Sequence, residues 1–483
     1  MDDRPAEQVV VVTPSKRRPR SNNAIGALHS AFTTRQRLEA LSQIQWPPDE
    51  PDELRDALLL QLSVVLRRPS TSEIQQLCAT LARLPPPEPT IKVLNLLIEC
   101  CRHGAASSVL SLWHLQSSQH NGSLALLESQ AAMDAMIHHL PSPDALGIFK
   151  NLTYYCEESR TTLLQWPGLV TKLTQLAMSD RLSAVWRNIS LSERKGLVQH
   201  GEVLSQWYEG LVHGSVKTIH NLLQCLLSVC MEGEAILLIL LHGDGLYPML
   251  IEGMLRESED SVVRKRCTRL VRLWTNDLTA PLLMQRRSLV SYVSEVAIYD
   301  DATEVRKEAT ETLAALSRLV PSQSSNAILD AWVHLTTTRS AAPSVLIRAL
   351  HAHRSHATLL ERPVLLEALG QLSRYTADHE ISPVVQEKGL ETILTLVLSD
   401  PSRVVGHESM LIAVVSQLDA SRVASTRRIL AAKAVVALTT TQRQALISYT
   451  SLVPSLMQFA SVCDDADLKK AAKESILLLL QEL

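Results

Sequence analysis

Three segments of this 483-residue chain share one pattern, and that pattern limits the folds available to it. Each segment begins with an acidic residue, reaches an aliphatic residue a few positions later, and continues with basic and then small residues. The segments are 260–267, 301–309 and 465–472. The aliphatic residues Val263 and Val305 are 42 residues apart. A unit of about 40 to 47 residues that cannot bury its own apolar face must stack on a copy of itself.

The residues around these segments have the periodicity of amphipathic helices. Val305, Ala309, Leu313 and Leu316 fall at the i, i+4, i+8 and i+11 positions of one helix face. Aromatic residues make up only 4% of the chain and there are only 16 glycines. A strand-rich fold usually needs more of both, so the composition favours helices.

The three segments resemble the turn and second helix of a HEAT repeat. The resemblance implies that Asp caps the helix, the aliphatic residue enters the core and the basic residue stays at the surface. A second pattern resembles armadillo repeats, in which a Gly between two helices precedes a hydrophobic residue and a run of Leu. It occurs at Gly168, Gly245 and Gly389. Their unequal spacing predicts degenerate repeats, and 180–214 is interpreted as an insertion.

These resemblances predict an all-α fold, a right-handed α-solenoid superhelix of armadillo/HEAT-like repeats that spans residues 34–483. Residues 1–33 mix Pro, Ser, Asn and Arg without helical periodicity and are predicted to be a disordered basic tail. Within the tail, four basic residues resemble a nuclear localisation signal. They are Lys16, Arg17, Arg18 and Arg20.

The eight cysteines form no CxxC pair and lie in apolar helical contexts, so they are interpreted as reduced, buried thiols. We therefore expect a cytoplasmic protein, with the nucleus as a second location through the basic tail. The apolar stretch 222–241 is interrupted by Glu232, Gly233 and Glu234, which predicts two buried helices joined by a turn and no membrane span. A net charge of −3 argues against a surface devoted to nucleic acid.

No nucleotide-binding, zinc-protease or nucleophile-elbow motif occurs in the chain. His351, His353 and His356 form the densest histidine cluster. These side chains could meet a metal ion in a loop, but on a helix residues two apart diverge, so a solvated helix end is the favoured interpretation. We expect no cofactor, no metal site and no catalysis.

Two asparagines lie where armadillo repeats place an Asn on the third helix, facing a concave groove. These are Asn151 and Asn221, and the resemblance implies that their amides pair with the backbone of an extended peptide. The alternative is an Asn that binds its own backbone or water.

Arg269, Arg272 and Trp274 fall on one predicted helix, with the two arginines adjacent on its surface. They are candidates to bind an acidic or aromatic partner segment. The alternative is a charged solvent face with Trp274 turned into the core.

The sequence thus predicts a non-enzymatic scaffold or adaptor that binds extended or helical segments of other proteins along its concave face. An alternative is a regulatory subunit of a catalytic partner such as a small GTPase or a phosphatase.

Overall fold

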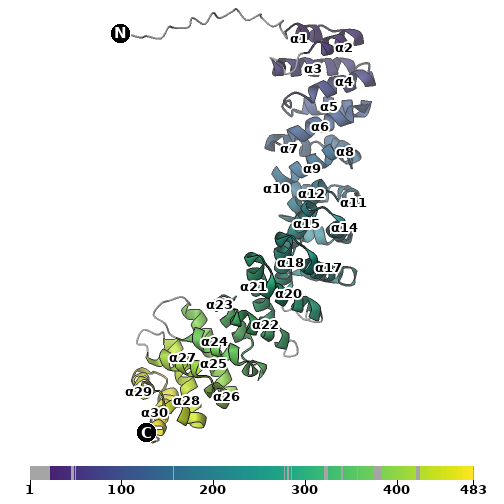
Figure 1. The fold of residues 1–483 in the computed structure, drawn as a ribbon. Coiled ribbons are helices and arrows are strands. Elements are labelled where there is room, and N and C mark those ends of the chain that lie inside the picture. The colour runs from purple at the N-terminus through teal and green to yellow at the C-terminus, as the bar shows by residue number, and fades with distance from the viewer. Residues whose placement is uncertain are drawn as a thin grey trace, which may run out of the picture. The chain divides into compact units, whose positions relative to one another are not determined.

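The computed structural model of the chain describes residues 22–44, 48, 50–155, 157–276, 278–279, 282–283, 286–319, 325–338, 341–355, 357–374, 382–419 and 425–481. These residues form helices and turns without a strand, so the predicted all-α solenoid is confirmed. The helices group into two compact units, Met1–Glu193 and Arg194–Leu483 (Figure 1).

The first unit is built from two series of helices. Its elements are α1 Asn22–His29, α2 Thr34–Ser42, α3 Pro51–Val65, α4 Thr71–Leu81, α5 Ile91–Cys100, η1 Cys101–Ala105, α6 Ala106–Gln116, α7 His120–Glu128, α8 Gln130–His138, α9 Pro143–Tyr155, α10 Glu157–Gln165, α11 Leu169–Thr174 and α12 Asp180–Ser190. Helices α1, α3, α5 and α8 contact one another in order, as do α2, α4, α6, α9 and α12. The core lies between these two layers.

The second unit repeats this arrangement as helical hairpins. Its elements are α13 Arg194–Val198, α14 Gly201–His213, α15 Val216–Val229, α16 Gly233–Leu241, η2 His242–Asp244, α17 Leu246–Glu257, α18 Ser261–Trp274, α20 Arg287–Tyr299, α21 Thr303–Leu319, α22 Ser325–Thr337, α23 Pro343–Ala352, η4 Ala357–Glu361, α24 Pro363–Ser373, α25 Pro383–Ser399, α26 Pro401–Val405, α27 Glu408–Asp419, α28 Ser425–Ile447, α29 Leu452–Val462 and α30 Ala466–Leu480. The first helices α14, α17, α20, α22, α24, α27 and α29 stack in one layer. The second helices α15, α18, α21, α23, α25, α28 and α30 stack in the other.

The predicted boundary between tail and solenoid at residue 33 is wrong. Helix α1 begins at Asn22, buries Leu28 completely and packs on α2 and α3. Its eight residues are too few to show a clear helical period by themselves, which is why the sequence placed them in the tail. The predicted localisation residues Lys16, Arg17, Arg18 and Arg20 lie outside the described residues.

The segment 180–214 is not an insertion. Helix α12 packs on α9 as the next member of the second layer of its unit, and α14 opens the first hairpin of the other unit. Each contributes a fully buried tryptophan, Trp186 and Trp207. These two repeats lack the pattern of acidic and basic residues by which the segments 260–267, 301–309 and 465–472 were recognised in the sequence. Only the burial of their side chains in the structure identifies them as repeats.

The predicted register of the HEAT-like segments is confirmed in the core. Val263 and Val305 are buried, while Arg306 is half-buried and Lys307 exposed. Asp260 caps α18 by accepting the Val262 N–H at 2.8 Å.

In the segment 301–309, the aspartate that accepts a backbone N–H at the start of the helix lies one residue earlier than predicted. Asp300, not Asp301, accepts the Ala302 N–H at 2.9 Å, and the Asp301 side chain is exposed. The Arg264 guanidinium of the neighbouring hairpin contacts both aspartates, but only the Asp300 carboxylate is buried.

An arginine braces the turn of two successive hairpins in the same way. The Arg264 guanidinium donates to the carbonyls of Ser258 and Glu259, both at 2.9 Å. One repeat later, Arg306 donates to the carbonyls of Asp300 and Asp301 at 2.6 and 3.2 Å. Each arginine thus binds carbonyls that the preceding helix leaves free at its C-terminal end.

Arg264 also joins its hairpin to the next one. Its guanidinium contacts both carboxylate oxygens of Asp300, with Nε to Oδ2 at 2.6 Å and Nη2 to Oδ1 at 3.0 Å. The Asp300 side chain is 3% exposed. Burial alone would raise the pKa of Asp300, but the hydrogen bonds from Arg264 and Ala302 lower it below the ordinary value.

The three armadillo-like glycines have different roles. Gly168 and Gly245 precede α11 and α17 with φ angles of 71° and 86°, the left-handed region that glycine adopts readily. Gly389 instead lies inside α25, so its predicted position between helices is wrong. A Cβ there would stand 2.2 Å from the Ser373 hydroxyl, which means that the glycine permits close packing of α25 on α24.

The predicted pair of helices at 222–241 is confirmed as α15 and α16, but α16 is buried on one side only and exposes Leu237, Leu238 and Leu241. No single helix among the described residues is long and apolar enough to cross a membrane; only the bent pair Gly233–Asp244 and Leu246–Glu257 reaches that length and composition jointly. The cysteines that the structure describes are buried and form no disulfide with one another, and they are Cys78, Cys100, Cys101, Cys225, Cys230, Cys267 and Cys463.

Replacing Val305 by Asp should destabilise the second unit by several kcal/mol, because it places an unpaired charge in the contact between hairpins. Replacing the exposed Lys307, two positions further along the helix, by Asp should change stability by no more than about 0.5 kcal/mol. Urea unfolding followed by circular dichroism measures both. Equal losses in the two variants would show that the assigned register is wrong.

Replacing Arg264 by Met should cost about 3 kcal/mol at neutral pH, because the Asp300 carboxylate stays buried without its cation. The lowered pKa of Asp300 means that its ion pair stabilises the fold above the ordinary carboxyl pKa of about 4 and is lost as the pH falls below it. The difference in unfolding free energy between wild type and variant should therefore narrow when the pH is lowered from neutral to below the ordinary carboxyl pKa. Urea unfolding measured at these two pH values gives this difference, and an unchanged difference would contradict the role assigned to the ion pair.

Candidate functional site

The second helices of the second unit present a charged surface that crosses several hairpins. Helices α18, α21, α23 and α25 contact one another in order, and we call their exposed side the second-helix face. Ion pairs link its members: Lys265 to Glu304 at 3.1 Å, Arg272 to Glu308 at 2.9 Å and Arg348 to Glu311 at 3.5 Å. The carboxylates of α21 are therefore shared between its two neighbours.

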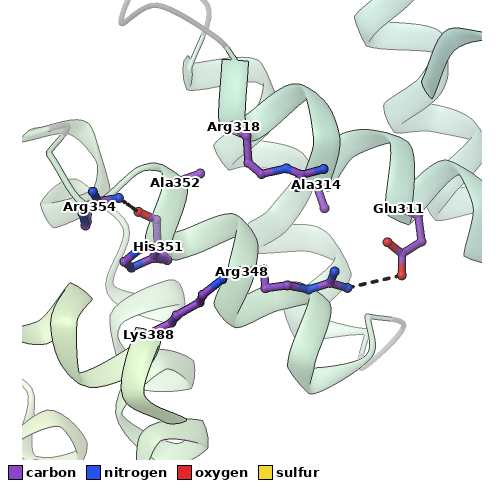
Figure 2. A pocket seen from close by; sticks show the side chains of 8 residues that line it. All are labelled: Glu311, Ala314, Arg318, Arg348, His351, Ala352, Arg354 and Lys388. Carbon is purple, nitrogen blue, oxygen red and sulfur yellow. Dashed lines mark hydrogen bonds and ion pairs between the residues drawn. The ribbon is translucent and has the colours of Figure 1, made fainter. Parts of the chain in front are cut away.

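A basic pocket of about 220 Å³ opens in this face between α21, α23 and α25 (Figure 2). Its lining residues are Glu311, Ala314, Arg318, Arg348, His351, Ala352, Arg354 and Lys388. Four of these side chains are cations and one is a carboxylate. The side chains that line the pocket therefore carry an excess of positive charge.

Neighbouring groups fix the side chains on one side of the basic pocket. The Arg348 guanidinium donates to the Ser344 carbonyl at 3.2 Å, and Arg354 donates to the His351 carbonyl at 2.8 Å. Arg318 and Lys388 make no ion pair with a residue that the structure describes. Two cations are thus held in place and two remain available to a ligand.

His351 lies in the floor of this pocket. Its Nδ1 is 3.2 Å from the Thr392 hydroxyl and its Nε2 is 3.6 Å from the Glu391 carboxylate. Burial and the nearby Arg354 lower the pKa of His351 below its ordinary value, so the ring is uncharged at neutral pH. His351 therefore contributes a hydrogen-bonding group rather than a charge.

The structure corrects the interpretation of the histidine cluster as a solvated helix end. His353 is completely buried, because it follows the last turn of α23 and turns into the core. His356 lies outside the described residues. Among the residues with described positions, no group of three or more His, Cys, Asp or Glu side chains could hold a metal ion.

The two candidate arginines of α18 lie on the second-helix face in different environments. Arg269 is exposed, and the described part of the chain offers it no ion pair. Arg272 is half-buried in its pair with Glu308. The Arg269 side chain is thus accessible at the surface, whereas the charge of Arg272 is used mainly between hairpins.

Trp274 is not presented to a partner. Its side chain is fully buried and its Nε1 donates to the Cys230 Sγ at 3.2 Å, which ties α18 to the end of α15. The prediction that it contacts a partner segment is wrong. The alternative interpretation, a tryptophan in the core beside a charged face, describes the structure.

Asn151 acts between helices of the first unit. Its side-chain amide donates to the His114 carbonyl at 3.3 Å and to the Ser117 hydroxyl at 3.0 Å, both at the end of α6. One repeat on, the buried Asn188 donates in the same way to the Lys150 carbonyl and the Thr153 hydroxyl, both at 3.2 Å. These amides join successive second helices, so the geometry does not support a peptide-binding role for Asn151.

Asn221 is only 5% exposed within α15 of the second unit. An amide at that depth is not available to the backbone of a bound peptide. The prediction that Asn221 lines a binding groove therefore fails on burial.

The residues of the basic pocket were missed by the sequence analysis as a group. Glu311, Arg348 and Lys388 lie 37 and 40 residues apart in turn, which is close to one repeat. A scan for charged residues that recur at the repeat spacing could have aligned them. Without known hairpin boundaries, that signal is hidden by the unequal repeat lengths.

A second hollow of about 430 Å³ lies between α14, α15, α17 and α18 and is mainly apolar. Its rim includes the exposed side chains of Val216 and Met249, beside the acidic Glu257 and Asp260. It differs from the basic pocket in both polarity and charge sign.

Comparison with known proteins supports the fold. No protein-family model matches the chain, and no curated protein matches it. A structure solved in work on the phosphorylation switch in the interaction between cadherin and beta-catenin is similar, with a TM-score of 0.58, 12% identity and coverage of 95% of this chain and 100% of that one. The crystal structure of She4p gives a TM-score of 0.47 and 13% identity, with coverage of 95% and 71%. The first likeness shows a helical-repeat fold.

Replacing Asn151 and Asn188 by Ala should lower the stability of the first unit by about 1 kcal/mol for each lost amide, because their hydrogen bonds join successive helices. The exposed Asn121 of α7 provides the matched control, and Asn121→Ala should have almost no effect. Urea unfolding measures the three variants. If Asn151→Ala and Asn188→Ala also leave stability unchanged, these amides do not join the helices.

Proposed function

We propose that this chain is a non-enzymatic scaffold that binds segments of other proteins along the second-helix face of its second unit. The observation that carries the proposal is the continuity of this face. Four successive helices place cations on one surface, and packing and ion pairs between hairpins join these helices. A rigid surface loses little entropy on binding, which favours recognition of an extended segment.

The charge pattern of the face indicates the chemistry of the partner. Arg269 and the free cations of the basic pocket protrude, whereas the carboxylates of α21 are engaged with Lys265, Arg272 and Arg348. A partner segment with acidic side chains would complement this pattern and would approach faster at low ionic strength. The concave groove and the asparagine pairs implied by the armadillo resemblance are not needed for this mode of binding.

The cellular location is part of the same proposal. We infer a cytoplasmic protein that also enters the nucleus through the basic segment Lys16–Arg20. Fluorescence microscopy of the chain with and without residues 1–21 tests this, and an unchanged distribution would remove the nuclear part of the proposal.

Affinity capture with the tagged full chain tests the scaffold. We expect a set of captured proteins whose binding weakens by about tenfold when Lys265 and Arg269 are both replaced by Glu, because the exposed Arg269 and the partly exposed Lys265 of α18 become anions. Arg256→Glu is the matched control, since Arg256 is an exposed cation on the first-helix layer. Deleting residues 1–21 should leave capture unchanged, because α1 and the solenoid remain.

Two outcomes would contradict the scaffold proposal. One is equal capture by the α18 variant and wild type, and the other is loss of capture on deletion of the tail alone. Capture of one enzyme at fixed stoichiometry, with a change in its rate, would instead identify the chain as a regulatory subunit of a catalytic partner.

A further inference from the structure

We propose that the basic pocket between α21, α23 and α25 binds the phosphate group of a phosphorylated serine or threonine in a partner protein. This inference rests on the proposed scaffold function and names the chemistry of one of its contacts.

The charge of the pocket matches a phosphate better than a carboxylate. The lining of the pocket contains four cations, Arg318, Arg348, Arg354 and Lys388, and a single carboxylate, Glu311. A phosphorylated side chain carries about −1.5 to −2 charges at neutral pH and three acceptor oxygens, whereas Asp or Glu carries one charge. Three of the four cations are arginines, whose planar guanidinium groups donate paired hydrogen bonds to phosphate oxygens.

The pocket is also organised before a ligand arrives. Its cations come from three successive hairpins. The Arg354 guanidinium is oriented by the His351 carbonyl (Figure 2), and the Arg348 guanidinium by the Ser344 carbonyl. Glu311 lies 3.5 Å from Arg348, a long contact that a stronger anion can replace. A phosphate would therefore gain several charge-assisted hydrogen bonds while ordering mainly Arg318 and Lys388.

The surroundings of the pocket favour a single phosphate over a polyanion. Glu304, Glu308 and Glu311 follow one another along the face of α21 that leads into the pocket. A nucleic-acid backbone or an anionic membrane would have to lie across these carboxylates as well as the cations. A phosphorylated side chain reaches the pocket from a peptide whose other residues avoid them, as in known recognition of phosphorylated motifs by arginine clusters.

Fluorescence polarisation with labelled peptide pools tests the assignment on the full chain. One pool has a fixed central phosphoserine between degenerate flanks, and the second has serine at the same position. We expect wild type to bind the phosphoserine pool about tenfold tighter than the serine pool. The double variant Arg318→Gln and Lys388→Gln should lose this preference, while the control Arg256→Gln should keep it.

The fold of the double variant is checked by its urea midpoint, which should match wild type because Arg318 is exposed, Lys388 is only half-buried and neither is ion-paired within the described chain. Equal affinity of wild type for the two pools would overturn the inference. So would a double variant that folds normally and keeps the preference.

Two further probes separate the phosphopeptide from other phosphate sources. Vesicles of phosphatidylcholine with phosphatidylinositol bisphosphate, and a single-stranded RNA, should bind more weakly than the phosphoserine pool. Stronger binding of either probe that the double variant abolishes would assign the pocket to that ligand and overturn the phosphopeptide.

Failure of this inference is distinguishable from failure of the scaffold. If the pocket variant captures the same proteins as wild type, and phosphatase treatment of those proteins changes nothing, the phosphate site is wrong and the scaffold stands. If Lys265→Glu with Arg269→Glu also leaves capture unchanged, the scaffold proposal itself is wrong.

Discussion

The aliphatic residue that a second helix buries against its neighbours is the contact on which the rest of the second unit depends. Val263 and Val305 occupy this position in successive hairpins. Full burial of one such side chain stabilises the fold by about 1.5 to 3 kcal/mol, which is large beside the marginal stability of a domain. No hairpin can make this contact alone, so the order of the stack and the alignment of its surface charges both follow from it.

The fixed alignment of the second helices explains how a charged surface can coexist with a net charge near neutrality. Glu304, Glu308 and Glu311 lie on one helix and each meets a cation from the helix on one side or the other. Exposed pairs of this kind contribute little stability individually. They neutralise three carboxylates of α21, while Arg269, Arg318 and Lys388 keep charges that no ion pair among the described residues compensates.

Much of the fold could be predicted because its determinants are local. The burial of Val305 beside a more exposed Arg306 follows from helical periodicity alone, and Asp260 caps its helix by a contact two residues away. Predictions failed where burial depends on which neighbour covers a side chain. Trp274 and Asn221 are enclosed by adjacent hairpins, and Gly389 serves a close helix contact that no turn signal reveals.

The candidate site was predicted only in part for the same reason. Arg269 was found because a single helix determines its exposure, whereas the basic pocket draws on residues from Glu311 to Lys388 in three helices. Its charge is a property of stacked repeats and not of any one segment. Histidines 351 and 353 were recognised as a cluster, but the neighbouring helices decide that one lines the pocket and the other is buried.

The arginine braces of Arg264 and Arg306 have a consequence for how such a chain can change over evolution. Each guanidinium reaches back six and five residues to two carbonyls of its own turn, a geometry that allows only one turn length. Gain or loss of a single residue at 258–260 or 300–302 would move the carbonyls out of reach and misplace Asp300. Variation in repeat length should therefore accumulate in the connections between hairpins, whereas the turns inside the hairpins, at 258–260 and 300–302, should keep a constant length.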